Sequence, residues 1–528
     1  MTDSPEANSV YSGELSNWEY HGVLAHVLGV RFSHLTQKQG HDPFYPYAQR
    51  QACSGDITQR LKIDTKAIKE RTAEPTPELA WKYVTAYFEG AREAAFGLVD
   101  RTSFETRLRA HLEGYSKNED PAWYALRNAI YATGCRLELS KTGKFRHAFQ
   151  TSWTYFSNCF IGRFCLEYML STVALRLACS KGLHRQAASS WNMSREEKEL
   201  RNRIFWAAYC LEKNCAARSG RPSMIDDDQI SCSLPQKDHG AGSSNSQYAI
   251  TVIKLAQMSS LTSKRLTLIE THQQSAEVLV RTVAELDQKL KTLASHIQKV
   301  VDLDSPLEPG KPGQDIDLQQ AIYIRMAYYT IVLDVHTPLS YPWSQRLFNL
   351  QGDPDLQLQV QASSETVIQT ARKAAMATQF VRLDACTSIL IGFHCPLYAL
   401  INMFVHILED TQRSTVQSNL SLLDIGVSHF LRVEFNSESE VSQQFPKEVA
   451  QLARQAVESS NSGMTGSVEG SDVLNLLGSI GHGEKPGLNN WVDPMGDGFS
   501  SSLLDLDFEH CSTFLPNPDF EDLMNFLY

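Results

Sequence analysis

The stretch from Ser194 to Pro235 constrains the fold most strongly, because it specifies a long helix together with its start and its end. Ser194 and Glu197 have the spacing of a capping box, which satisfies backbone N–H groups at a helix start. Ser219-Gly220-Arg221-Pro222 predicts the helix end, since glycine accepts positive φ and proline cannot continue a helix. Apolar residues between these signals recur at helical spacing and predict a largely buried helix: Ile204, Phe205, Trp206, Ala208, Tyr209, Leu211 and Cys215.

The residue order in this stretch resembles a known family. R-x-R-x-FW-x-x-Y-x-x-E is followed by SGRPSxIDDDxIxCxLP, a combination similar to the middle homology region of fungal zinc-cluster transcription factors. Segments 87–108 and 174–185 add to this resemblance. The signature residues of the resemblance are Arg203, Phe205, Trp206, Tyr209, Gly220, Arg221, Pro222, Asp227, Asp228 and Pro235.

The resemblance implies a large all-α regulatory domain in a nuclear transcription regulator that controls a metabolic or secondary-metabolite gene set. No convincing strand pattern occurs along the chain, which also favours an all-α fold. Family members usually carry about one extra helical hairpin between the equivalents of Phe160 and Glu167, which nearly abut here.

The family reads DNA with six cysteines that bind two zinc ions, and this chain has no such cluster. Cys53 is the only cysteine before Cys135, and thiolate ligands have no nearby substitute here. The net charge of −11 also argues against an overall attraction to nucleic acid. We therefore expect no zinc or other cofactor in this chain and no direct DNA contact from this chain alone.

Composition changes along the chain predict four parts. Residues 1–72 read as a poorly ordered N-terminal arm, and residues 73–458 as the helical regulatory domain. Residues 459–487 are rich in Ser and Gly and read as a linker. Residues 488–528 read as an acidic-hydrophobic activation segment, so the domain is predicted to lie between a disordered arm and a disordered tail.

The C-terminal segment mixes acidic and apolar residues. From Pro486 to Tyr528 there are eight Asp or Glu and no Lys or Arg. This interleaving is typical of disordered segments that dock short helices into apolar grooves, here of a coactivator or the transcription machinery. A C-terminal helix folded onto the chain's own core is the alternative. The residues predicted to dock are Trp491, Phe499, Leu503, Leu504, Phe508, Phe520, Leu523 and Phe526.

A heptad seam follows Ala276. Apolar residues recur there at alternating spacings of three and four, which fits a dimerising coiled coil or one helix of an internal bundle. We favour internal packing, because the seam has little more than three heptads. An exposed seam would instead suit a homodimer or heterodimer. The alternative function is then a helical ligand-binding or inhibitory partner of a full-length factor.

No sequence pattern indicates catalysis, and we predict that the chain is not an enzyme. HExxH, GxSxG, P-loop and GxGxxG patterns are absent. The triplet Asp226-Asp227-Asp228 could bind a divalent cation, although a solvated loop or helix N-cap is the favoured interpretation. Residues 385–408 carry no charge, but Pro396 breaks the run, which favours two buried helix segments over a membrane span.

Overall fold

The computed structural model describes eleven ranges: 73–114, 121–141, 145–158, 167–219, 222–235, 243–266, 275–304, 316–341, 354–384, 386–437 and 444–461. Within them the chain forms thirteen α-helices and no strand, so the all-α prediction is confirmed. The chain divides into two units, 1–478 and 479–528, and every described residue belongs to the first. The predicted arm, the predicted activation segment and most of the predicted linker lie outside the described residues.

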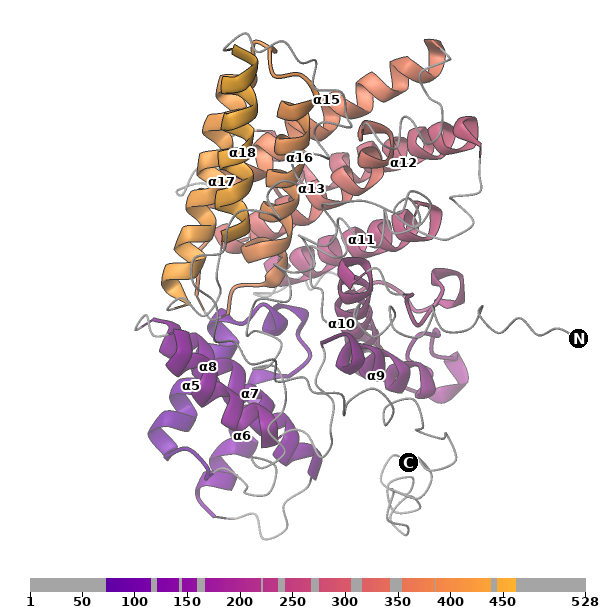
Figure 1. The fold of residues 1–528 in the computed structure, drawn as a ribbon. Coiled ribbons are helices and arrows are strands. Elements are labelled where there is room, and N and C mark those ends of the chain that lie inside the picture. The colour runs from indigo at the N-terminus through magenta and orange to yellow at the C-terminus, as the bar shows by residue number, and fades with distance from the viewer. Residues whose placement is uncertain are drawn as a thin grey trace, which may run out of the picture. The chain divides into compact units, whose positions relative to one another are not determined.

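The first four helices form a core of their own. Thr76 before Pro77 predicts a helix start, and the structure confirms it, because the Thr76 hydroxyl accepts a hydrogen bond from the Leu79 N–H. Asp100 in the turn-like sequence DRTS also predicts a cap, which is confirmed because it accepts from the Ser103 N–H at 2.7 Å. The third helix packs on both the first and the fourth (Figure 1). These helices are α5 (Pro77–Gly90), α6 (Arg101–Leu112), α7 (Pro121–Ser140) and α8 (Phe145–Asn158).

The next three helices include the long helix predicted from the stretch Ser194 to Pro235. The Ser194 capping box is confirmed, since Glu197 N–H donates to Ser194 Oγ and Ser194 N–H donates to the Glu197 carboxylate. Gly182 ends the preceding helix with φ of 67°, and Leu183 N–H reaches back to Ala178 O. The second of these helices packs on both others. They are α9 (Glu167–Ser180), α10 (Arg195–Ser219) and α11 (Ser243–Leu266).

The predicted heptad seam is an internal core element. Its helix contacts α11 and two later helices of the domain. The prediction of internal packing is therefore confirmed, and these side chains offer no surface to a second chain. The buried seam residues of α12 (Ala276–Ile297) are Leu279, Val283, Leu286, Leu290, Leu293 and Ile297.

The remaining helices pack around two central ones. α13 (Leu318–Ser340) contacts α11, α12 and α15 (Pro354–Ala377), while α16 (Cys395–Glu409) contacts α13, α15 and the last two helices. Figure 1 shows these last two, drawn in the lightest orange, alongside α16. They are α17 (Val416–Asn436) and α18 (Gln444–Asn461), the second of which ends three residues beyond the predicted domain boundary at 458.

The prolines of the sequence HTPLSYPW predict an extended turn from residue 338, but Pro338 does not begin one. It lies inside the last turn of α13, which continues to Ser340. Proline lacks an N–H and removes one helical hydrogen bond there. The helix nevertheless persists, because it is held by burial on nearly every side, including Leu339 at 0% exposure.

The uncharged run near residue 400 forms two buried segments, as predicted. A π-helix, η10 (Leu390–His394), leads directly into α16 at Cys395. Within the described residues, Leu390–Glu409 is the one helical stretch long and apolar enough to cross a membrane, and 72% of it is buried inside the domain. Its apolar character is accounted for by its place in the core.

Candidate functional site

The signature residues meet at a junction between α10 and the segment 222–235 that follows it. Phe205 and Tyr209 are fully buried and Trp206 is nearly so. Their rings pack against one another, with the Trp206 and Tyr209 centroids 5.1 Å apart in an edge-to-face arrangement. Trp206 Nε1 donates to the Ser233 carbonyl at 2.9 Å. The aromatic face of α10 thus fixes the path of the chain after the helix ends.

Asp227 is the polar centre of this junction. Its Oδ1 accepts a hydrogen bond from the Tyr209 hydroxyl at 2.9 Å and lies 3.0 Å from Lys213 Nζ. Lys213 is almost entirely buried and also donates to the Ile225 carbonyl at 2.8 Å. Burial and the Asp227 carboxylate raise the pKa of Tyr209, so its hydroxyl stays protonated and donates. The signature aspartate is therefore a structural partner of α10.

A second buried carboxylate holds the first residues of the segment. Glu212 is 0% exposed and accepts from the Ser223 hydroxyl and from the Met224 N–H, both at 2.8 Å. Pro222 is fixed from the other side, because the Tyr168 hydroxyl of α9 donates to its carbonyl at 2.9 Å. A buried carboxylate is stable only when its oxygens are hydrogen-bonded or paired with a cation. Glu212 meets this condition through the segment that it anchors.

The other two aspartates of the triplet face Lys264 of α11. Asp226 caps the short helix η6 (Asp227–Gln229) and forms a 2.7 Å ion pair with Lys264, which lowers the pKa of Asp226. The Asp228 side chain is 90% exposed and lies 3.7 Å from the same lysine. The N-cap interpretation is confirmed. Among the described residues no group of three His, Cys, Asp or Glu is arranged to hold a metal ion.

The remaining signature residues are not part of the polar contacts around Asp227. Arg203 donates to Glu199 at 3.2 Å, and its guanidinium lies against Gly97, where a Cβ atom would come within 2.8 Å of Nη1. Pro235 is buried. Gly220 and Arg221 lie outside the described residues. Residue order alone did not single out Lys213, although a lysine on the apolar stretch of a helix is a recognisable sign of a buried ion pair.

We predict that Glu212→Ala lowers the free energy of unfolding by about 2 kcal/mol, because it removes the carboxylate that accepts from the Ser223 hydroxyl and the Met224 N–H and leaves a gap at a fully buried position. Asp228→Ala is the matched control, since it removes a neighbouring carboxylate that is 90% exposed. Its effect should stay within about 0.5 kcal/mol. Urea unfolding followed by circular dichroism measures both. Equal effects for the two variants would contradict the anchoring role of Glu212.

One predicted core face of α10 is not buried. Ile204 is 38% exposed and Leu211 is 46% exposed, so the prediction of burial is wrong for these two residues, whereas Cys215 is buried as predicted. Ile204 and Leu211 line a cavity of about 1270 Å³ between α9, α10, α11, α13, the residues that follow α5, and the π-helix. Helical periodicity marks an apolar face but does not say what covers it. In this chain the face opens into a cavity.

A serine, a histidine and an aspartate also come together away from this cavity. His336 Nδ1 lies 3.1 Å from Ser363 Oγ, and His336 Nε2 lies 3.4 Å from Asp287 Oδ1. This order resembles that of a hydrolase triad, but Ser363 is 0% exposed and His336 is 2% exposed. A nucleophile must reach its substrate, so this cluster is a structural link between α12, α13 and α15.

The fold is a helical domain in which buried polar contacts fix the junction between α10 and residues 222–235. Residues 154–300 match the family model of the fungal specific transcription factor domain. The chain therefore carries a fungal specific transcription factor domain, as its resemblance predicts. The match covers the end of α8 through α12, including the whole junction.

Curated relatives are fungal transcription regulators. An ABC-transporter-regulating transcription factor of Aspergillus oryzae is 27% identical over 290 residues, which are 52% of this chain and 32% of that protein. A negative regulator of pleiotropic drug resistance of Candida glabrata is 36% identical over 94 residues, 17% of this chain and 9% of that protein. The chain spans about a third of the length of the first of these relatives. No solved structure matches the chain.

Proposed function

We propose that this chain is a transcription regulator of the fungal zinc-cluster class, acting through its helical domain and its acidic C-terminal segment on a metabolic or secondary-metabolite gene set. The observation that carries the proposal is the transcription factor domain at residues 154–300. The relatives named above are transcription regulators, which agrees with it. The expected site of action is the nucleus, and a fluorescent fusion of the chain tests that location.

The helical domain and the acidic C-terminal segment have different proposed roles, which follow from their residue composition. The helical domain supplies a folded body, and residues 488–528 supply apolar side chains interleaved with carboxylates. Such segments bind coactivators or the transcription machinery by docking short amphipathic helices. DNA reading is assigned to a DNA-bound partner or to sequence beyond these 528 residues, because the chain has no six-cysteine cluster. No zinc is therefore assigned to it.

The alternative function, an inhibitory partner of a full-length factor, lacks the contact surface that it was proposed to use. It required the α12 seam to pair with another chain, and Leu286 and Leu290 of that seam are 0% and 1% exposed. A homodimer or heterodimer would need a different surface. We therefore keep the transcription regulator as the proposed function.

Residues 486–528 fused to an unrelated DNA-binding module should activate a reporter gene. A variant with Phe520, Leu523 and Phe526 changed to Ala should lose most of that activity, because the docking side chains are gone while the charge is unchanged. A second variant with Asp519, Glu521 and Asp522 changed to Asn or Gln separates charge from docking. A silent wild-type fusion at normal expression would remove the activator proposal.

A further inference from the structure

The cavity beside the junction has an apolar wall that faces no other part of the described domain. Four of its large apolar side chains are exposed: Leu177 at 59%, Ile204 at 38%, Leu211 at 46% and Ile389 at 49%. Small-molecule sites are mostly apolar concavities with a few polar groups placed to orient the ligand. The volume of about 1270 Å³ is ample for a ligand of that kind.

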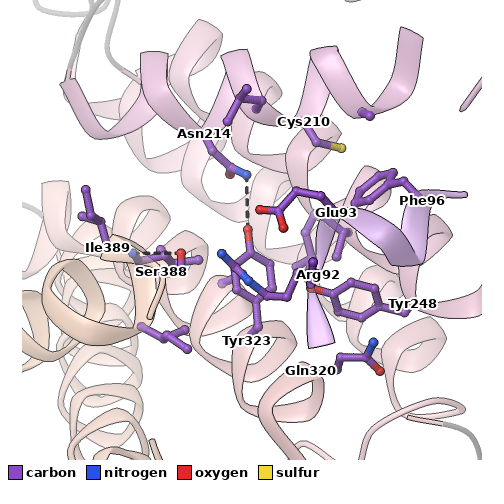
Figure 2. Close-up of a pocket in the computed structure, with 18 of the residues that line it drawn as sticks. Arg92, Glu93, Phe96, Cys210, Asn214, Tyr248, Gln320, Tyr323, Ser388 and Ile389 are labelled. Atoms are coloured by element: carbon purple, nitrogen blue, oxygen red, sulfur yellow. Dashed lines mark hydrogen bonds between the residues drawn. The ribbon is translucent and has the colours of Figure 1, made fainter. Parts of the chain in front are cut away.

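The cavity is also lined by a group of polar side chains around Tyr323 (Figure 2). The Arg92 guanidinium carbon lies 5.1 Å from the ring centroid of Tyr323. The Tyr323 hydroxyl accepts a hydrogen bond from Asn214 Nδ2 at 3.3 Å, and the Tyr248 ring stands edge-on to Tyr323 at 6.4 Å. Figure 2 shows the Glu93 carboxylate in the same group.

Three groups of this cluster have no hydrogen-bond or ion-pair partner among the described side chains: the half-buried Arg92, the solvent-exposed Glu93 and the Tyr248 hydroxyl. Neither Arg92 nor Glu93 forms an ion pair within the described residues, with each other or with another side chain. Tyr248 is 2% exposed, and its hydroxyl has no hydrogen-bond partner in that part of the chain. Burial raises the pKa of Tyr248, so the hydroxyl remains a donor. The hydroxyl is therefore open to a hydrogen bond with a molecule bound in the cavity.

Other charged groups at the cavity are already engaged. Arg382 forms a 2.8 Å ion pair with Asp384. Asp317 caps α13 by accepting from the Gln320 N–H at 2.9 Å. Arg218 donates to the Asn214 carbonyl at 3.3 Å. Within the cluster around Tyr323, the charged groups without an ion pair are Arg92 and Glu93, which are adjacent in the chain and opposite in sign.

The π-helix supplies a further wall of the cavity. Leu390, Ile391 and His394 line it, and π-helical turns occur frequently at functional sites. The turn is supported from behind, because His429 Nε2 donates to the Gly392 carbonyl at 2.9 Å. Burial lowers the pKa of His429 to about 4, so the ring is neutral and this contact does not change near neutral pH.

We propose that the cavity binds a zwitterionic amphipathic small molecule, an α-amino acid with a long apolar side chain. Its carboxylate would accept from the Arg92 guanidinium and the Tyr248 hydroxyl. Its ammonium would pair with Glu93, and its apolar chain would cover Leu177, Ile204 and Leu211. A carboxylic acid alone would leave Glu93 unpaired beside an anion, and an amine alone would leave Arg92 unpaired beside a cation.

Three probes with closely matched apolar bodies test this proposal: 2-aminodecanoic acid, decanoic acid and decylamine. Isothermal titration calorimetry on the full chain should give the zwitterion an affinity at least about tenfold above either single-charge probe, since each charge-assisted hydrogen bond contributes on that scale. Arg92→Met and Tyr248→Phe should each weaken the zwitterion without weakening decylamine. Glu93→Gln should weaken the zwitterion without weakening decanoic acid.

Lys289→Met is the control, because Lys289 is an exposed charge on α12 that does not line the cavity. It should leave all three affinities unchanged. Thermal melting of each variant shows whether the fold is kept. No binding of the zwitterion at 1 mM, or a wild-type affinity order that does not place it first, would overturn the proposal. The reporter fusion of residues 486–528 lacks this cavity, so its result is independent.

Discussion

Replacing Leu286 by Asp is expected to abolish cooperative unfolding of the helical domain at 25 °C or to lower the free energy of unfolding by about 5 kcal/mol or more. Leu286 is 0% exposed at the centre of the α12 seam. The variant loses a buried apolar side chain and places a carboxylate at a position that solvent does not reach. That loss is comparable to the whole stability of many domains. Circular dichroism during thermal or urea unfolding measures it.

Gln288→Asp is the matched control for this prediction. It places the same new charge two residues further along α12, where Gln288 is exposed to solvent. Its effect should stay within about 0.5 kcal/mol. A Leu286→Asp chain that melts like wild type but loses self-association in sedimentation would contradict the burial of the seam. The seam would then be an interface between chains.

Gly134→Ala is expected to be the second severe change, lowering the free energy of unfolding by about 3 kcal/mol or more. A Cβ atom at Gly134 in α7 would lie 1.9 Å from the Tyr83 carbonyl oxygen of α5 and 2.6 Å from its carbonyl carbon. The obstacle is backbone, so no side-chain rotation relieves the contact and the two helices must separate. Replacing glycine by alanine inside a helix ordinarily stabilises it. A loss of stability at Gly134 would therefore come from the close contact between α5 and α7.

Gly426→Ala is the control with the opposite expected sign. Gly426 lies within α17, and the nearest atom to a new Cβ is Leu400 Cδ1 at 3.5 Å, an ordinary contact. Alanine should therefore raise the stability there by about 0.5 to 1 kcal/mol. Urea unfolding of both variants is the measurement. A stabilised Gly134→Ala protein would show that α5 and α7 do not cross this closely.

The Gly134 crossing also bears on the proposed ligand site. Thr133, Arg136 and Leu137 of α7 line the cavity next to it. A separation of α5 from α7 would shift these residues relative to Arg92, which follows α5 after a single residue. We therefore expect any Gly134→Ala protein that remains folded to bind 2-aminodecanoic acid more weakly, a result that calorimetry on the same sample can show.

Local signals in the sequence were reliable guides to the helices. Ser194 with Glu197, Thr76 and Asp100 each predicted a helix start that the structure has, because a cap depends on atoms only two or three residues away. The seam spacing predicted α12, and burial of Leu286 settled between internal packing and a coiled coil. The extended turn predicted at Pro338 was wrong, because packing of α13 against distant residues outweighs the tendency of proline to end a helix.

The sequence by itself determined that the chain is helical, where several helices begin, and that residues 194–235 carry the signature of the transcription factor domain. These properties rest on contacts between near neighbours and on residue order. Only the tertiary structure decided that Asp227 pairs with Lys213, that Glu212 holds Ser223, and that Ile204 and Leu211 face a cavity. Those outcomes depend on which helices meet. Periodicity defines an apolar face of α10, but the neighbours that cover it or leave it open come from far along the chain.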